Sequence, residues 1–169
     1  TAAELMKTIK EKDVKFFDLR FTDPKGKLQH VTMDVGILDE EMIEEGIMFD
    51  GSSITGWKAI NESDMLLKLD LETIHMDPFF AQSTMVCFCD VLDPVTGEKY
   101  NRDPRGIAKA AEAYLKTLGI GDTVYVGPEA EFFIFDQVRY DQTGHSGFYH
   151  IDSEEGAWNI GQEGHNLGG

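Results

Sequence analysis

The segment Asp50–Ser53 places one carboxylate, one glycine and two hydroxyls between apolar flanking residues. Glycine readily takes φ > 0, so Gly51 predicts a tight turn that another group can approach closely. We expect this loop to present the Asp50 carboxylate. A purely structural alternative is an Asx turn, in which Asp50 accepts hydrogen bonds from its own loop.

A second pair of acidic residues, Glu129 and Glu131, lies two positions apart in a predicted strand, so both carboxylates would project from one face. Hard divalent cations such as Mg²⁺ and Mn²⁺ take oxygen ligands of this kind. The alternative is an ordinary strand whose polar face lies in water. Phe133 and Phe135 continue the same face, which would set the two carboxylates at the mouth of an apolar interior and favour compensation by metal ions.

The charge balance argues against several classes of partner. The chain has 169 residues, with 31 Asp and Glu against 15 Lys and Arg, and a formal net charge of −16. Such a field repels phosphate backbones and anionic lipid headgroups, so we expect neither nucleic acid nor a membrane surface as a partner. The acidic residues occur in short groups, which are typical of solvated faces and helix N-termini.

Nothing in the apolar pattern predicts a membrane span or a signal peptide, and a cytoplasmic location is the expectation. Cys87 and Cys89 share one face of a predicted strand, where a disulfide between them would be strained. We interpret them as two buried thiols. The five histidines show no metal-ligand spacing and are expected to lie at the surface or to make hydrogen bonds.

Periodicity predicts a small α+β domain that is complete by about residue 100, with an apolar pattern on both faces of one strand that marks it as central. Aspartate N-caps and glycine stops support the helix ends. The expected elements are a helix over 2–12, a hairpin of strands 14–22 and 27–34, a helix over 39–45, and strands 65–71 and 84–91, the last being the central strand.

A long amphipathic helix is predicted next, with Asp103 as N-cap, Pro104 at its first position and Gly119 just past its end. Its apolar stripe should pack against a sizeable surface. We place the domain boundary just before this helix, giving domains 1–102 and 103–169.

Beyond the helix, strands are expected over 123–127 and 129–135, and the polar, glycine-rich remainder is expected to be irregular. One helix and two strands cannot close a core of their own. The second domain is therefore expected to be truncated or to depend on something absent.

Several motifs in the right order resemble the N-terminal portion of bacterial glutamine synthetase, type I. An eight-residue spacer separates the first two of them. The motifs are Phe49-Asp50-Gly51-Ser52-Ser53, Glu62-Ser63-Asp64, the hairpin Asp18-Leu19-Arg20-Phe21-Thr22-Asp23, Asp77-Pro78-Phe79, Arg102-Asp103-Pro104-Arg105 and Gly127-Pro128-Glu129-Ala130-Glu131-Phe132-Phe133. The resemblance implies an α+β fold, with a small β-grasp-like N-terminal domain followed by the start of a glutamine synthetase/guanido kinase-like catalytic domain.

The resemblance also implies an ATP-dependent ligase that joins ammonia to L-glutamate through γ-glutamyl phosphate. By carry-over, Asp50 is the catalytic residue that attracts and deprotonates ammonium, with the Ser53 hydroxyl beside it. Glu129 and Glu131 are implied metal ligands for two or more Mg²⁺ or Mn²⁺ ions, Glu131 for the ion near glutamate and Glu129 for the ion at the ATP phosphates.

Family members of this type form a homo-oligomer, a dodecamer of two stacked hexameric rings, and one subunit lends its Asp50 loop to the catalytic domain of the next. Trp57, just after that loop, is then either an interface anchor or a core residue. Because further ligands of the family site would lie beyond Gly169, the 169-residue chain alone is expected to be inactive.

Two other interpretations remain open. A related ligase could join another amine to the γ-carboxyl of glutamate, although the intact Asp50 and Ser53 favour ammonia. The chain could instead be a non-catalytic assembly or regulatory module built on the same fold.

Overall fold

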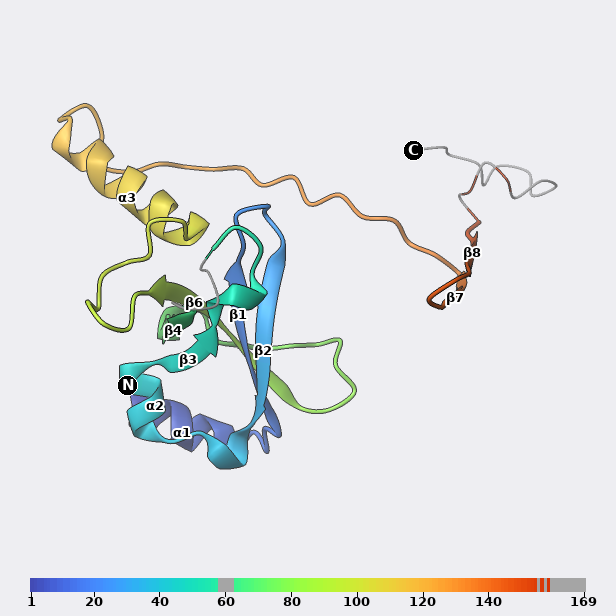
Figure 1. Ribbon diagram of the computed structural model, residues 1–169, viewed down its shortest axis with the longest axis horizontal. Helices are drawn as coiled ribbons and strands as arrows, with labels where there is room; N and C mark the ends of the chain where they lie inside the picture. Colours follow the sequence, from blue (N-terminus) through green and yellow to red (C-terminus); the bar gives the residue numbers. More distant parts are fainter. Residues whose placement is uncertain (58–62, 155, 157, 159–169) are drawn as a thin grey trace. The chain divides into compact units, whose positions relative to one another are not determined.

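A mixed β-sheet organises the first of two units in the computed structural model, which describes residues 1–57, 63–154, 156 and 158 (Figure 1). The units are Thr1–Val124 and Tyr125–Gly169. The sheet order is β2-β1-β6-β4-β3, with β5 also paired to β6. The strands are β1 (Phe16–Thr22), β2 (Leu28–Asp34), β3 (Ile47–Asp50), β4 (Asp64–Leu69), β5 (His75–Met76) and β6 (Thr84–Leu92).

Strand β6 is the centre of this sheet, as its apolar pattern predicts. It pairs in parallel with β1 and antiparallel with β4 and β5. Met85, Cys87, Cys89 and Val91 on one face and Val86 on the other are all fully buried or nearly so. Both cysteines are free and buried, which confirms their interpretation as thiols.

Two short helices cover part of the sheet, α1 (Ala2–Glu11) and α2 (Glu40–Glu45). Thr1 and Glu4 form a capping box at the start of α1, and Asp39 caps α2 by accepting from the Met42 N–H. The buried side chains of both helices join the core of the sheet. Within the described part of the chain, no helix is long and apolar enough to cross a membrane.

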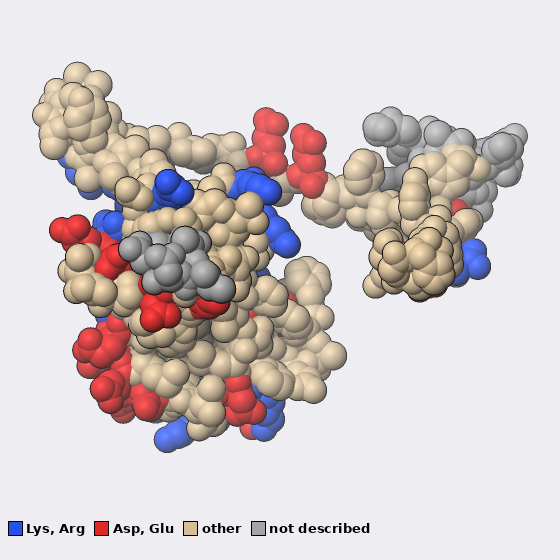
Figure 2. Space-filling model, in the orientation of Figure 1, with Lys and Arg blue, Asp and Glu red and all other residues tan. Residues whose placement is uncertain are grey.

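The acidic residues of α2 lie on a solvated face, as their grouping predicts. Glu40, Glu41, Glu44 and Glu45 are exposed, while Ile43 points into the core. Figure 2 shows acidic side chains gathered at this end of the first unit.

A buried carboxylate, Asp18, connects β1 and β2. It is fully buried and accepts hydrogen bonds from the Thr32 hydroxyl (2.6 Å) and Arg20 Nε (2.8 Å), with His30 Nδ1 at 2.8 Å. Arg20 also donates to Asp77 (2.7 Å). Burial raises the pKa of Asp18, but these hydrogen bonds together outweigh it and hold the pKa below its ordinary value.

Helix α3 (Pro104–Thr117) is confirmed with its predicted N-cap, because the Asp103 carboxylate accepts from the N–H groups of Arg105 and Gly106. Gly119 follows its end at φ 67°. The prediction for its apolar stripe was wrong: Ile107 is 56% exposed and Tyr114 64% exposed in the described structure. The helix contacts the sheet through charged residues of its first turns instead.

The second unit contains an antiparallel hairpin of β7 (Gln137–Gln142) and β8 (Gly147–Asp152). Both predictions for this region were wrong. Residues 123–127 and 129–135 pair with no other strand of the described chain, and the hairpin falls in the segment expected to be irregular. Extended apolar residues become a strand only when a partner strand accepts their backbone bonds, and the sequence pattern does not show whether one is present.

The Asp18 carboxylate should make stability depend on pH with a definite sign. Its pKa is lowered on folding, so its contribution is present above the unfolded pKa of about 3.9 and is lost as pH falls through the folded pKa. We expect Asp18→Asn to lower the free energy of unfolding by about 1 to 3 kcal/mol at pH 7. The difference from the parent chain should shrink below about pH 4 in urea titrations.

The exposed Asp122→Asn variant is the matched control and should stay within about 0.5 kcal/mol of the parent chain. An Asp18→Asn deficit that is constant from pH 7 to pH 3 would contradict the ionised role of this side chain.

Candidate functional site

The predicted catalytic residues lie at an edge of the first sheet. Asp50 is the last residue of the edge strand β3, and Ser53 ends the short 3₁₀ turn η2 (Gly51–Ser53) that follows. Both side chains are exposed. The loop therefore presents a carboxylate and a hydroxyl to solvent, as expected from its composition.

Hydrogen bonds from Ser52 orient the Asp50 carboxylate. One oxygen of Asp50 accepts both the Ser52 N–H (2.9 Å) and the Ser52 hydroxyl (2.7 Å). The Asx-turn geometry is thus present, and it holds the exposed acid in one orientation. The Ser52 hydroxyl, followed by the Ser52 amide, lowers the pKa of Asp50 below its ordinary value. Sequence reasoning assigned no role to Ser52, although a serine two residues after an aspartate is a signal for this turn.

Gly51 is needed for space, which corrects the expectation of a left-handed conformation. The residues with positive φ among the described glycines do not include Gly51. A Cβ at Gly51 would lie 2.4 Å from Met65 Cγ and 3.0 Å from the Ser63 carbonyl oxygen. The turn can pass directly over β4 only because this side chain is missing.

A second carboxylate lies across the ladder from Asp50. The β3–β4 register pairs Asp50 with Asp64, and both residues are exposed. Side chains directly opposite on antiparallel strands lie on one face, with Cβ atoms about 4.5 to 5.5 Å apart. Two acids in this arrangement favour a cation nearby. The motif Glu62-Ser63-Asp64 includes this aspartate, but its place opposite Asp50 depends on a strand register that the sequence does not show.

Trp57 follows the loop and belongs to the core. It is 6% exposed and contacts the rings of Phe21, Phe49 and Tyr100, with centroids 5.6, 6.0 and 5.5 Å away. The core interpretation of Trp57 is therefore confirmed. Tyr100 connects this aromatic cluster to the segment just before α3.

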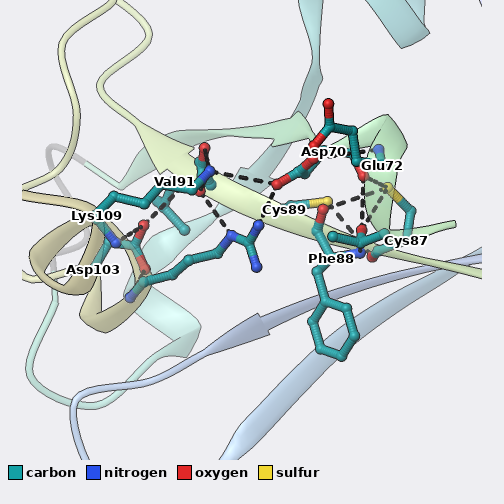
Figure 3. A network of polar contacts seen from close by, with 12 residues as sticks. Asp70, Glu72, Cys87, Phe88, Cys89, Val91, Asp103 and Lys109 are labelled. Atoms are coloured by element: carbon teal, nitrogen blue, oxygen red, sulfur yellow. Dashed lines mark hydrogen bonds and ion pairs between the residues drawn. The ribbon is translucent and has the colours of Figure 1, made fainter. Parts of the chain in front are cut away.

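The first turns of α3 are attached to the sheet by a polar network (Figure 3). Arg105 donates to Asp90 (2.9 Å) and pairs with Asp70, while Lys109 contacts Asp90 (2.6 Å) and Asp70 (3.4 Å). The buried Asp103 carboxylate also accepts from the Val91 N–H of β6 (3.2 Å). Burial raises the pKa of Asp103 above its ordinary value, although hydrogen bonds from the N–H groups of Val91, Arg105 and Gly106 act to lower it.

The predicted metal ligands, Glu129 and Glu131, lie in the second unit. Both are exposed and stand in an extended segment outside the strands described there. Figure 2 shows acidic side chains projecting from this segment. No group of three or more potential metal ligands occurs among the described residues. The donor type suits Mg²⁺ or Mn²⁺, but two carboxylates form only part of a ligand set.

The fold and the site define a class of protein: a β-grasp domain with an acidic edge loop, followed by a helix and a segment with paired glutamates. The family model "Glutamine synthetase, beta-Grasp domain" matches residues 13–94, and "Glutamine synthetase, catalytic domain" matches residues 101–166. The chain belongs to the glutamine synthetase family. Its expected α+β fold class, with a β-grasp first domain, is confirmed.

Individual relatives agree with this assignment. The chain is 72% identical over 155 residues to a glutamine synthetase of Rhizobium meliloti (strain 1021), a match that covers 92% of the chain and 33% of the relative. It is 61% identical over 170 residues to the Bradyrhizobium diazoefficiens protein of that name, covering 99% of the chain and 36% of the relative. A solved Plasmodium falciparum glutamine synthetase matches with a TM-score of 0.71 and 29% identity, over 91% of this chain and 30% of that one.

The chain thus spans about a third of the length of the curated relatives it matches.

The close approach of Gly51 to β4 predicts that this position tolerates no side chain. We expect Gly51→Ala to lower the free energy of unfolding by about 1 to 3 kcal/mol, because Met65 and the Ser63 carbonyl must move. Gly127→Ala is the control, since a Cβ there meets no atom within 4 Å. Equal unfolding midpoints in urea for the two variants would contradict the steric account.

The hydrogen bonds to Asp50 predict which serine substitution raises its pKa more. Ser52→Ala should raise the pKa of Asp50, and Ser63→Ala should raise it less, because the Ser63 hydroxyl is a weaker contributor. A carboxyl-carbon NMR titration of Asp50 in the three chains measures this directly. A pKa that is unchanged in Ser52→Ala, or a larger rise in Ser63→Ala, would contradict the geometry.

Proposed function

We propose that the protein catalyses the ATP-dependent ligation of ammonia to L-glutamate, giving L-glutamine in nitrogen metabolism. The observation that carries this proposal is the oriented, exposed Asp50 carboxylate in a chain 72% identical to a glutamine synthetase. Asp50 is ionised at neutral pH, because an ordinary aspartate already is and the Ser52 hydrogen bonds lower its pKa further, so it can attract an ammonium cation.

In this proposal the reaction has two chemical steps. A γ-carboxylate oxygen of glutamate attacks the terminal phosphorus of ATP, which releases ADP and forms γ-glutamyl phosphate. Ammonia then attacks the carbonyl carbon of the acyl phosphate, the carbon–oxygen bond to phosphate breaks, phosphate leaves and glutamine results. Asp50 draws ammonium to the site and accepts a proton from it, and Ser53 offers a hydroxyl on the same turn.

Glu129 and Glu131 are the residues of this chain that would hold divalent cations, Mg²⁺ or Mn²⁺, with further ligands from elsewhere. Their carboxylate donors and their spacing of two residues suit neighbouring ions. We assign Glu131 to the ion near glutamate and Glu129 to the ion at the nucleotide phosphates. Bound metal would offset the negative charge of the phosphoryl group during transfer.

We further propose that the active site is shared between subunits of a homo-oligomer, a dodecamer of two stacked rings in the cytoplasm. The support is the separation of chemistry along the chain: Asp50 lies in the β-grasp unit and the paired glutamates lie in the second unit. A closed head-to-tail ring lets every subunit give one loop and receive one.

We also propose a domain boundary at 102/103, just before α3. The support is that the β-grasp match ends at residue 94 and the catalytic match begins at residue 101.

A mixing experiment tests the shared site. We use a chimera in which this chain replaces the equivalent third of the Rhizobium meliloti relative. Asp50→Ala and Glu129→Ala subunits should each be inactive alone. When the two are unfolded and reassembled together at equal amounts, about a quarter of the interfaces in a head-to-tail ring receive two intact halves. We therefore expect recovery to about a quarter of parent activity.

The 169-residue chain by itself is the negative control and should have no ligase activity. An active Asp50→Ala chimera would overturn the proposed role of Asp50. Two inactive variants that recover nothing in mixed rings would overturn the shared site and leave a site within one subunit.

A further inference from the structure

In the described structure, a charged side chain of the segment that leads into α3 makes a polar contact just after the Asp50 turn. Arg102 Nη1 donates a 2.7 Å hydrogen bond to the carbonyl oxygen of Gly56. Both residues are exposed, and 46 positions separate them in the chain. A charged donor on a carbonyl is stronger than a neutral one, and here it joins two segments that have no strand pairing with each other.

A continuous set of backbone hydrogen bonds leads from Trp57, the residue after Gly56, back to the start of the turn beside Asp50. The Trp57 N–H donates to the Ile54 carbonyl and the Ile54 N–H donates to the Gly51 carbonyl, each at 3.1 Å. The Gly51 N–H donates to Ser63 at 2.7 Å, which ties the start of the turn to the residue before β4. A shift at Gly56 is therefore passed through two successive turns to the residue next to Asp50.

The backbone at Arg102, the donor of this hydrogen bond, is held in place by its neighbours. Arg102 directly precedes Asp103, whose buried carboxylate bonds to β6 and caps α3. Arg105 and Lys109, one and two turns further along, are paired with acidic residues of the sheet. The Arg102 backbone is thus attached to the sheet on one side, and its side chain reaches the loop on the other.

We propose that Arg102 is a positioning residue for Asp50. Its guanidinium holds the Gly51–Trp57 segment against the residues that lead into α3. This contact sets the position of the Asp50 carboxylate where ammonium binds. The inference rests on the proposed role of Asp50. Arg102 touches neither the carboxylate nor a substrate in this scheme, and it acts only through the Gly56 carbonyl.

This role has a kinetic consequence that a general loss of stability does not have. Ammonium is the substrate that Asp50 attracts, whereas glutamate and ATP bind elsewhere in the proposed site. Loosening the loop should therefore raise the KM for ammonium while leaving the KM for glutamate nearly unchanged. We expect a rise of about tenfold, the change that loss of one charge-assisted hydrogen bond produces.

The test uses the active chimera described above with three substitutions. Arg102→Met removes every donor at similar length, Arg102→Lys keeps a charged donor, and Lys116→Met removes a charge from the far end of α3. We expect the ammonium KM to rise about tenfold in Arg102→Met and to stay within about threefold in Arg102→Lys. Lys116→Met should match the parent, and the glutamate KM should change less than twofold throughout.

Asp50→Asn, measured alongside, separates this inference from the proposed function. If Asp50→Asn raises the ammonium KM and Arg102→Met does not, the positioning role is wrong and the proposed function stands. If Arg102→Met raises both KM values together, or lowers only kcat, the contact is structural and the inference is overturned. If Asp50→Asn leaves the ammonium KM unchanged, the role of Asp50 fails and the inference fails with it.

Discussion

The ion pairs between the head of α3 and the β-grasp sheet are the interaction on which the arrangement of the first unit depends. Arg105 and Lys109 share two acceptors, Asp70 and Asp90, at the ends of neighbouring segments of the sheet. All four side chains are partly shielded from water, so these pairs are screened less than exposed ones. The apolar stripe of α3 is exposed, so these ion pairs, with the Asp103 cap, are what attach the helix to the sheet.

Because of these ion pairs, the start of the catalytic segment packs with the β-grasp sheet. The match to the catalytic domain begins at residue 101, yet in space α3 belongs to the compact unit Thr1–Val124. Arg102, at the start of the matched segment, contacts Gly56, and Tyr100, just before that segment, contacts Trp57. The ion pairs of Arg105 and Lys109 with the sheet thus cross the proposed boundary at 102/103 within one compact unit.

Much of the first unit could be predicted from the sequence because its signals are local. Capping aspartates at Asp39 and Asp103 mark the starts of α2 and α3, and apolar residues on both faces mark β6 as central. The exposed Asp50 in a tight turn follows from Asp, Gly and Ser in succession. These features depend on neighbours within a few positions, so the chain displays them directly.

The features that could not be predicted depend on residues far apart in sequence. Asp70 and Arg105 are 35 positions apart, and Arg102 and Gly56 are 46 apart, so neither contact has a local pattern. Asp64 faces Asp50 only because of the β3–β4 register. Residues 129–135 have a strand pattern without a strand, because pairing requires a partner that the pattern does not specify. The place of Glu129 and Glu131 in a metal site likewise remains a prediction.

The central claim is that the Asp50 loop and the head of α3 form one cooperative unit, and native-state amide hydrogen exchange tests it most directly. The Ile54 and Trp57 amides report on the loop, and the Ile107 amide, bonded to the Asp103 carbonyl, reports on the helix. We expect all three to open with the same free energy and the same dependence on urea. Loop amides that exchange at far lower free energy than Ile107, with no urea dependence, would contradict the claim.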